Sequence, residues 1–468
     1  MTVRKVEVAI IGAGVSGLKA GNELIKLENL SIDDILILEA DSRIGGRLKT
    51  DTTSSKIGLS YDLGASWYHD ALSNCVLQEL SDDGTIDWSK DVYFDDKDSV
   101  WYDENGIIDI NSLKLNRVYE ELQKFIEMYF FENTSNQDMS LQDIVTVYLQ
   151  KYDKRLTPMQ KQYVPRMIRF FELWYGISWN NISGKYAIME HEGRNLFNIQ
   201  GYQVLIDKLA TNVNQSVLLN HKVIGIEKQK SSITIDIDNG SQVICKNLIV
   251  TVPLSILQAK VITWKPELPQ QIEKSLTTTH WGALGKVIFE FDNVWWDDNQ
   301  DRFEIIAKPN IDISKDNLTS LPAPFSYPAH IINCASKSRP KTGPALLILT
   351  QAPLTNYLEA HPDQAWEYFK PMVSKLKISD RIVSEPINTI TTNWTQNENI
   401  RGSYSALYTN DDATDLIIHL SGDYPEFDGY DKNIRFAGEH TILEGNGCVH
   451  GAYASGIRAA NHILNNYK

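Results

Sequence analysis

The sequence of 468 residues lacks any apolar run long enough to cross a membrane, since a spanning helix needs about 20 apolar residues. The chain opens with MTVRKVEVAII, in which a short apolar run passes straight into glycines without a small-residue cleavage site. We therefore expect a folded strand there and no signal peptide. The closing residues, HILNNYK, carry no peroxisomal, ER-retention or prenylation signal. These absences predict a cytoplasmic protein without membrane contact.

Cysteine and positive charge are also scarce. The four cysteines, Cys75, Cys245, Cys334 and Cys448, lie far apart and form no CxxC pair, so we expect neither a disulfide framework nor a bound metal. Lysine and arginine total 45 against 60 acidic residues, a net charge of -15, which excludes the basic footprint of a nucleic-acid-binding protein. The acidic excess either keeps the protein in solution or attracts cationic substrates to a cleft.

What is present begins with a βαβ pattern. Residues 6–11, VEVAII, have the continuous apolar run of a buried parallel strand, residues 15–27 the periodicity of a helix, and residues 35–38 a second strand. Strand patterns return in KVIGIEKQ, SITIDI and NLIVTV, with a hairpin turn expected at Asn239-Gly240. The chain ends in a strand, IRFAGEH, a glycine-rich loop and a helix.

The first βα turn, IGAGVSG at 11–17, has glycines spaced for dinucleotide binding. Gly12 permits the tight turn, Gly14 lets the backbone approach a pyrophosphate, and Gly17 allows the helix to pack on the strand. The helix N-terminus then faces the phosphates with its partial positive charge. Glu39, at the end of the second strand, can accept hydrogen bonds from ribose hydroxyls. These features fit either NAD or FAD.

The segment that follows favours FAD. Gly45 and Gly46 can bring backbone N–H groups to a second phosphate, and Arg47 can supply positive charge. A surface salt bridge is the alternative role for Arg43 and Arg47.

A second domain is expected between the segments of the first. Residues 81–104 are acidic and aromatic and indicate hairpins and loops, whereas residues 115–150 and 158–176 have helical periodicity. The length also exceeds what one core usually supports. We predict an α/β fold, α+β overall, in which a Rossmann-like FAD-binding domain comprises 1–80, 186–260 and 430–468, and a discontinuous substrate-binding domain of mixed sheet and helices comprises 81–185 and 261–429.

LEADSRIGGRLKT, together with DLGASW at 62–67 and FAGEHT at 436–441, resembles the flavin amine oxidase family, and within it the fungal polyamine oxidases. Further similar stretches, spread over nearly the whole chain, include GASWYHD, ELWYG, EGRN, HWGALGKVIFEF, LLILTQAPLTN, RGSYSA and FAGEHTILEGNGCVHGAY. The resemblance implies a noncovalent FAD covered by a substrate domain. It also implies oxidation of a carbon beside an amine nitrogen, with O2 as acceptor.

The resemblance implies a set of cofactor-binding residues: Gly12, Gly14, Gly17, Glu39, Ala40, Arg47, Gly64, Ala65, Ser66, Trp67, Val223, Glu439, Thr441 and Val449. In that family the position of Val223 meets the adenine and that of Glu439 the ribityl and phosphate portion. Val449 precedes a helix whose N-terminus faces the pyrimidine side of the flavin. Ser403 replaces the cysteine to which monoamine oxidases attach their flavin.

The resemblance also implies catalytic positions. Lys286 matches a lysine that holds a water near flavin N5, although a strand lysine is more often solvated. His69 matches a histidine that lines the polyamine channel and can adjust the charge of the substrate near neutral pH, with a loop-closing hydrogen bond as the alternative. Asn195 matches a polar position beside the substrate. Trp174 matches a channel aromatic, or a core residue, and Tyr404 stands as the one aromatic wall beside the flavin, because Cys448 occupies the other.

We therefore expect a polyamine oxidase, acting on spermine or on acetylated spermine or spermidine, which produces H2O2 and is a monomer or homodimer. Asp95 and Asp96 are candidates to bind the distant ammonium groups, or are simply solvated. A monoamine or other amine oxidase is one alternative. An amino-acid oxidase would need a cation to hold the substrate carboxylate, and no arginine in the aligned channel positions clearly provides one. The other alternative is a catalytically weak flavoprotein that binds a hydrophobic ligand.

Overall fold

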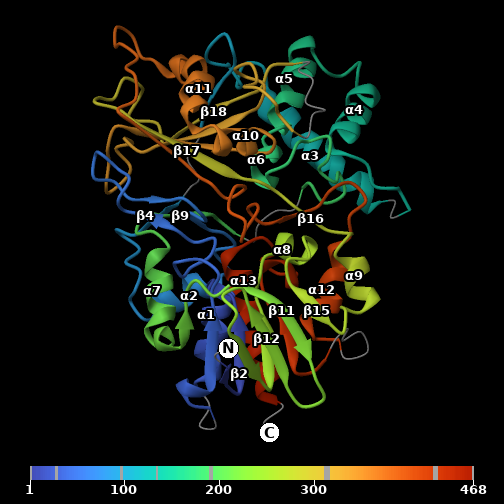
Figure 1. Ribbon diagram of the computed structural model, residues 1–468. Helices are drawn as coiled ribbons and strands as arrows, with labels where there is room; N and C mark the ends of the chain where they lie inside the picture. The colour runs from blue at the N-terminus through green and yellow to red at the C-terminus, as the bar shows by residue number, and fades with distance from the viewer. Residues whose placement is uncertain are drawn as a thin grey trace.

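The computed structural model describes residues 3–26, 30–94, 99–132, 135–188, 193–309, 317–424 and 431–465. The chain forms two stacked bodies (Figure 1). The lower body contains the N-terminal and C-terminal segments, and the upper body contains a large sheet, antiparallel except for its parallel edge strand β8, with helices on both faces. The chain therefore passes more than once between the two bodies.

A five-stranded parallel sheet forms the centre of the lower body. Its order is β10 (Val217–Leu218), β3 (Ile35–Leu38), β2 (Val8–Ile11), β14 (Asn247–Val250) and β23 (Ile434–Phe436). All residues of β2, β3, β14 and β23 are buried, as expected for parallel strands covered on both faces. The predicted βαβ unit is thereby confirmed.

Helices α1 (Val15–Leu24), α7 (Gln203–Thr211) and α13 (Val449–Leu464) pack beside this sheet, with α1 against both of the others. The contact between α1 and α13 is unusually close. A Cβ atom at Gly456 would lie only 2.4 Å from the backbone oxygen of Ser16. The first and last long helices of the chain can therefore adjoin only because α13 has glycine at this point.

A second sheet covers the other side of the parallel sheet. Its order is β1 (Val3–Lys5), β13 (Gln242–Cys245), β12 (Ile233–Ile237), β11 (Val223–Lys228) and β15 (Thr263–Lys265). The hairpin between β12 and β13 turns at Asn239-Gly240, where Gly240 has a φ of +82°, as the sequence predicts. Alongside lie α8 (Leu254–Gln258), α9 (Gln270–Ser275) and α12 (Ala413–Ser421).

The upper body is built on a six-stranded sheet of order β21 (Asn388–Thr391), β17 (Gly285–Glu290), β20 (Ala345–Thr350), β19 (Ala329–Asn333), β18 (Arg302–Ile305) and β8 (Val100–Tyr102). One face packs on α10 (Leu354–Ala360) and α11 (Ala365–Val373). The other face turns toward α3 (Leu115–Phe131), α4 (Leu141–Lys151), α5 (Pro158–Ile168) and α6 (Phe171–Tyr175). These four helices fall within the two ranges predicted to be helical, except that α4 ends one residue later, at Lys151.

Short strands connect the bodies. They are β4 (Thr50–Asp51) with β5 (Tyr61–Asp62), β6 (Trp67–Tyr68) with β9 (Leu196–Asn198) and β7 (Val92–Phe94), and β16 (His280–Trp281) with β22 (Ser405–Ala406). The expectation of hairpins and loops over 81–104 is confirmed only in part, since residues 83–91 form turns and loop, and after β8 the chain folds back so that Tyr102 bridges Ile107. Helix α2 (Cys75–Asp82) ends there, and β7 and β8 pair with β9 and β18, which are distant in sequence. Local pattern does not reveal such long-range pairing.

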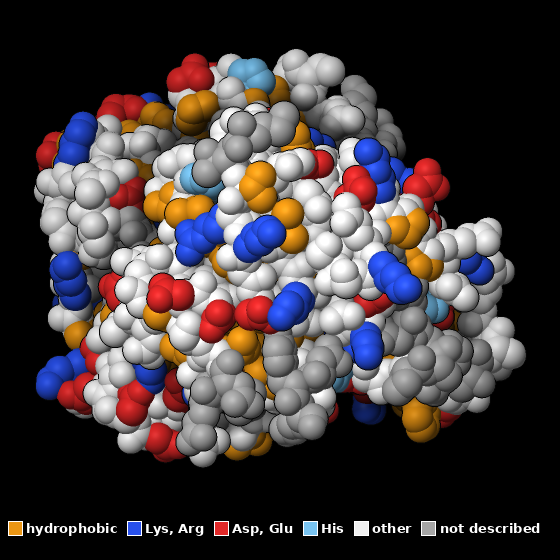
Figure 2. Space-filling view, turned by 60° about the horizontal axis from the view of Figure 1, so that its bottom comes forward, with side chains coloured by type: hydrophobic (Ala, Val, Ile, Leu, Met, Phe, Trp, Pro, Cys, Tyr) orange, Lys and Arg blue, Asp and Glu red, His pale blue; other side chains and the backbone are white. Residues whose placement is uncertain are grey.

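The division of the chain at residues 80, 185, 260 and 429 stays a prediction. Two elements pair across it: β15, beyond residue 260, pairs with β11, and α12, before residue 429, packs on β23. On the face that Figure 2 shows, acidic and basic side chains are interspersed, without a field of one sign. Within the described residues, every helix is too short or too polar to cross a membrane.

Candidate functional site

A cavity of about 1290 Å³ lies between the two bodies. It begins at the carboxyl ends of β2 and β3 and extends to the six-stranded sheet. Most of the predicted site residues line it, namely Gly12, Gly14, Glu39, Ala40, Arg47, Gly64, Ala65, Ser66, Trp67, His69, Trp174, Asn195, Val223, Lys286, Tyr404, Glu439 and Val449. Gly17 and Thr441 do not line the cavity. The site therefore draws on segments from almost the whole length of the chain.

The three glycines of the first turn have different surroundings. Gly12 has a φ of +102°, and a Cβ there would lie 2.5 Å from Thr251 Oγ1. A Cβ at Gly17 would lie 2.0 Å from the backbone oxygen of Gly12, so this glycine lets α1 approach the strand. At Gly14 the nearest atom would be Gly46 Cα at 4.0 Å, because this position faces the cavity. Only Gly14 leaves room for a ligand against the backbone.

Two helices begin at the cavity without a side-chain cap. The N-cap of α1 is Gly14, which has no side chain. The N-cap of α13 is Cys448, whose side chain accepts no hydrogen bond from the first turn of the helix. Both residues line the cavity. Because the first N–H groups of a helix have no partner within it, such ends bind anions. The cavity therefore offers two places for negatively charged parts of a ligand.

Glu39 binds the backbone of the glycine turn through its carboxylate. Its carboxylate accepts hydrogen bonds from the backbone N–H groups of Ala13, at 2.7 Å, and Asp41, at 2.9 Å. Burial raises the pKa of this carboxyl, and the two hydrogen bonds oppose the rise. The carboxylate thus fixes the glycine turn and also lies at the cavity wall.

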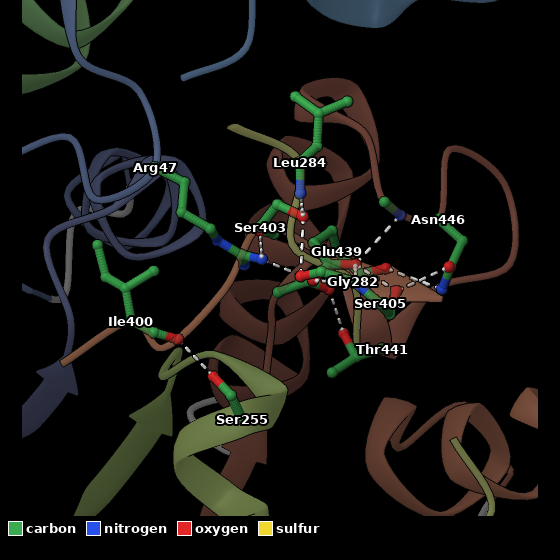
Figure 3. Close-up of polar contacts among 12 residues, drawn as sticks. Arg47, Ser255, Gly282, Leu284, Ile400, Ser403, Ser405, Glu439, Thr441 and Asn446 are labelled. Carbon is green, nitrogen blue, oxygen red and sulfur yellow. Dashed lines mark hydrogen bonds and ion pairs between the residues drawn. The ribbon is translucent and has the colours of Figure 1, made fainter. Parts of the chain in front are cut away.

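Arg47, which is partly exposed at the cavity, forms an ion pair with the buried Glu439. Arg47 Nη1 lies 2.9 Å from Glu439 Oε1 and donates a 2.7 Å hydrogen bond to the backbone oxygen of Ser403 (Figure 3). The hydroxyl of Ser405 and the N–H of Gly447 donate to Glu439 Oε2. Burial would raise the pKa of Glu439, but Arg47 and these donors hold it below its ordinary value. Glu439 therefore stays ionised.

Thr441, which the sequence predicts to be at the cofactor, supports the loop that follows β23, and its contact with a cofactor stays a prediction. Its hydroxyl donates to the backbone oxygen of Gly438, and Arg458 donates to both the hydroxyl and the backbone oxygen of Thr441. The side chain is fully buried in these contacts.

Lys286, on β17, is buried beneath the loop that carries Gly64 to Trp67. Its ammonium donates to the backbone oxygens of Asp62 and Gly64 and to Ser66 Oγ, at 2.6, 2.5 and 2.5 Å. An ammonium has three donors, so all three are used within the protein. Burial lowers the pKa of Lys286 to about 8, although the Asp62 carboxylate opposes the fall. Burial likewise raises the pKa of Asp62 to about 6.

The depressed pKa of Lys286 predicts a pH dependence of stability. Between pH 8 and its ordinary value of 10.5, the unfolded chain keeps a proton on Lys286 that the folded protein has lost. The free energy of unfolding therefore rises with pH across this window, by about 3 kcal/mol in full. Urea unfolding of the wild type and of Lys286→Met, followed from pH 7 to 10.5, should show this rise in the wild type alone. Parallel curves would contradict the assignment.

The other predicted substrate residues come together on one side. His69 Nδ1 lies 2.9 Å from Asn195 Oδ1, and the Trp67 ring packs edge-on against Phe197. The Tyr404 hydroxyl donates to the backbone oxygen of Trp174, whose indole is 43% exposed, which argues against a core role. Asp95 and Asp96 lie outside the described residues.

The polar residues of the cavity wall that the sequence did not predict include Arg302, Glu304 and His330 on the six-stranded sheet. The strand alternation around Phe303 carries a weak signal for the first two, because Arg302 and Glu304 share the face opposite to the core. Arg302 is an arginine of the cavity wall that lies outside the channel positions matched by resemblance, and binding of a carboxylate substrate there is untested.

Asp70, Cys448 and His450 form a further group beside the cavity. Each offers one potential metal ligand, and these ligand atoms lie within 4.8 Å of one another. The wide spacing of the cysteines did not indicate this group. His450 Nε2 and Asp70 Oδ2 are 3.3 Å apart, so these two side chains interact directly.

Three comparisons place the fold and the site among known proteins. The chain is 51% identical over 475 residues to the corticosteroid-binding protein of Candida albicans (strain SC5314 / ATCC MYA-2876), covering 99% of this chain and 96% of that protein. It is 27% identical over 470 residues to polyamine oxidase 5 of Oryza sativa subsp. japonica, covering 97% and 86%. Wild-type putrescine oxidase bound to putrescine superposes with a TM-score of 0.70 at 16% identity, covering 99% of this chain and all of that one.

The last comparison establishes the shared fold, and it agrees with the predicted α/β architecture. Residues 15–464 match the family model described as flavin containing amine oxidoreductase, which spans both bodies and the cavity between them. The chain belongs to the flavin-containing amine oxidoreductase family.

Proposed function

We propose that this protein is an FAD-dependent polyamine oxidase that acts on spermine or on an acetylated spermine or spermidine. The observation that carries the proposal is the single cavity that joins a dinucleotide cradle to a wall with a buried lysine. Family membership supports amine oxidation, and the similarity to a plant polyamine oxidase supports the substrate class.

The cavity residues fit FAD rather than a smaller flavin. Gly14 and the uncapped N-terminus of α1 would hold the pyrophosphate, Glu39 the ribose, and Val223 the adenine. The N-terminus of α13 would face the pyrimidine side of the ring and stabilise negative charge there. Ser403 offers no thiol for attachment, which supports noncovalent binding.

When bound, FAD supplies a two-electron oxidant that can be regenerated by O2. The overall reaction would consume the amine, O2 and water and give an aminoaldehyde, a shorter amine and H2O2. The nitrogen must be neutral for its lone pair to assist loss of the neighbouring hydrogen. His69, held by Asn195, would accept the proton that the bound amine gives up. Lys286 and the loop it anchors would hold the reacting groups away from bulk water.

The proposal predicts that spermine bleaches the flavin absorbance of the purified protein without O2 and generates H2O2 in air. Acid precipitation should release FAD into the supernatant. Spermidine, the acetylated polyamines, benzylamine and an amino acid would be titrated in parallel, and the products identified. Absence of bleaching with every polyamine would refute the substrate class, and flavin retained in the acid pellet would refute noncovalent binding.

A second candidate function is the binding of a steroid. It is favoured by the name of the Candida relative, which is 51% identical along almost the whole chain. The cavity of about 1290 Å³ exceeds the usual volume of a small-molecule site, roughly 300–1,000 Å³, so it can accommodate a second ligand beside a cofactor. A corticosteroid titration of the same sample decides between the two: tight binding without flavin reduction, combined with inert polyamines, would support this candidate.

A further inference from the structure

The cavity face of the six-stranded sheet presents one row of side chains that runs across four strands. Lys286 on β17 is paired with Leu349 on β20, Leu349 with His330 on β19, and His330 with Glu304 on β18. Residues paired in this way on adjacent strands project to the same face of the sheet. All four side chains line the cavity. The row therefore leads from the buried lysine to a carboxylate along one wall.

The alternation of the strands supports this orientation. Val287, Ile331, Phe303 and Ile305, the neighbours of the row, belong to the core beneath α10 and α11. Successive strands lie about 4.8 Å apart, so three steps place Glu304 about 14 Å from Lys286. That separation suits an extended, flexible substrate with charges at intervals and exceeds the reach of a short amine.

Glu304 retains acceptor capacity. Its side chain is 7% exposed, and His330 Nδ1 lies 2.9 Å from each of its carboxylate oxygens. A carboxylate has about four lone-pair sites, so one imidazole donor leaves room for an ammonium group. His330 is itself fixed by the edge of the Trp174 ring, with ring centres 5.4 Å apart. The carboxylate is thus held in place at the cavity wall.

The only other charged side chain of β18 on this face is Arg302. It lies two residues before Glu304 and is paired with Ile332, about 7 Å along the strand. A guanidinium repels an ammonium group, so a polycation would make its contact at the carboxylate. Glu304 thus has the position and the charge that the sequence led us to seek at Asp95 and Asp96.

We propose that Glu304, held by His330, binds the distal ammonium group of the polyamine while the reacting nitrogen lies near Lys286. This assignment rests on the proposed function for its substrate class. It makes Glu304 a residue that determines specificity for substrates with a charged end, and it makes His330 a positioning residue.

The test compares spermine with its N1,N12-diacetylated form, in which both end groups are neutral. Binding is measured by equilibrium dialysis without O2, after the flavin has been reduced with dithionite, so that no turnover is needed. In Glu304→Gln, the preference for spermine over diacetylspermine should fall roughly tenfold to a hundredfold, the worth of a charge-assisted hydrogen bond. Glu359→Gln, a matched change of a buried carboxylate that does not line the cavity, should keep the wild-type preference.

Glu304→Asp retains the charge but shortens the side chain, so it should lose roughly threefold. An unchanged preference in Glu304→Gln, or in Glu304→Asp if the glutamine variant does not fold, overturns the assignment. The two proposals fail separately. Flavin bleaching by spermine with an unchanged preference would refute only the role of Glu304. A collapsed preference without bleaching would refute only the oxidase function.

Discussion

Gly14→Ala is expected to give a folded protein that has lost its flavin, whereas Gly17→Ala should unfold the lower body, which contains the glycine turn. At Gly14 the added methyl group meets no protein atom closer than 4.0 Å, but it occupies the space against the first turn of α1. It would keep a phosphate from the helix N–H groups. We expect the affinity for FAD to fall roughly a hundredfold, the worth of one or two hydrogen bonds to a charged group.

At Gly17 the added carbon would lie 2.0 Å from the backbone oxygen of Gly12. Helix α1 would have to move away from the sheet, so the free energy of unfolding should fall by more than about 3 kcal/mol. The measurements are urea unfolding and the ratio of flavin to protein absorbance. Gly21→Ala, on the same helix, is the control, because its nearest neighbour would be the flexible end of Ile37 at 3.1 Å. A stable, flavin-containing Gly17→Ala protein would contradict the role of Gly17 in the packing of α1 on the glycine turn.

Lys286→Met is expected to retain FAD while slowing the reaction. The methionine can occupy the same space, but the acceptors of Asp62, Gly64 and Ser66 lose their common donor, and the cavity wall loses a buried polar group. We expect the slower of the two half-reactions to fall roughly a hundredfold. Stopped-flow absorbance, with spermine in the absence of O2 and then with O2 and the reduced protein, measures each half separately.

Lys19→Met is the matched control for this variant. Lys19 is also buried and lies in the lower body, but it pairs with Glu23 and Glu79 and does not line the cavity. Its replacement should leave both half-reactions near the wild-type rates. If both rates in Lys286→Met also equal those of the wild type, the lysine serves the fold and has no part in the chemistry.

The βαβ unit and the glycine turn could be predicted because their signals are local. The apolar run of β2, the glycines of the turn and Glu39 lie within about 30 consecutive residues, and each has a distinct physical role. The hairpin at Asn239-Gly240 is equally local, since the turn itself requires a residue with positive φ. Local chemistry sufficed for these elements.

The substrate side could not be predicted in the same way. Glu304 and Lys286 share one wall only through the pairing of β17, β20, β19 and β18, and strand order is decided by tertiary packing. The alternation around Phe303 indicates which side chains share a face but does not tell which face borders a cavity. The same reason explains why the sequence did not reveal the pairing of β7 with β9 and of β8 with β18. A cofactor contact at Thr441 stays a prediction, because matching a motif does not show which way a side chain turns and this one bonds to Gly438 and Arg458.

The position of α13 has a consequence for the order in which the site is assembled. Its N-terminus lines the cavity, it packs on α1, and β23 forms an edge of the parallel sheet. During synthesis the glycine turn at the start of α1 therefore leaves the ribosome hundreds of residues before α13 does. The upper sheet is complete once β21 has emerged, whereas the cavity gains the N-terminus of α13 only with that helix. We therefore expect capture of the proposed flavin to be a late step of biogenesis.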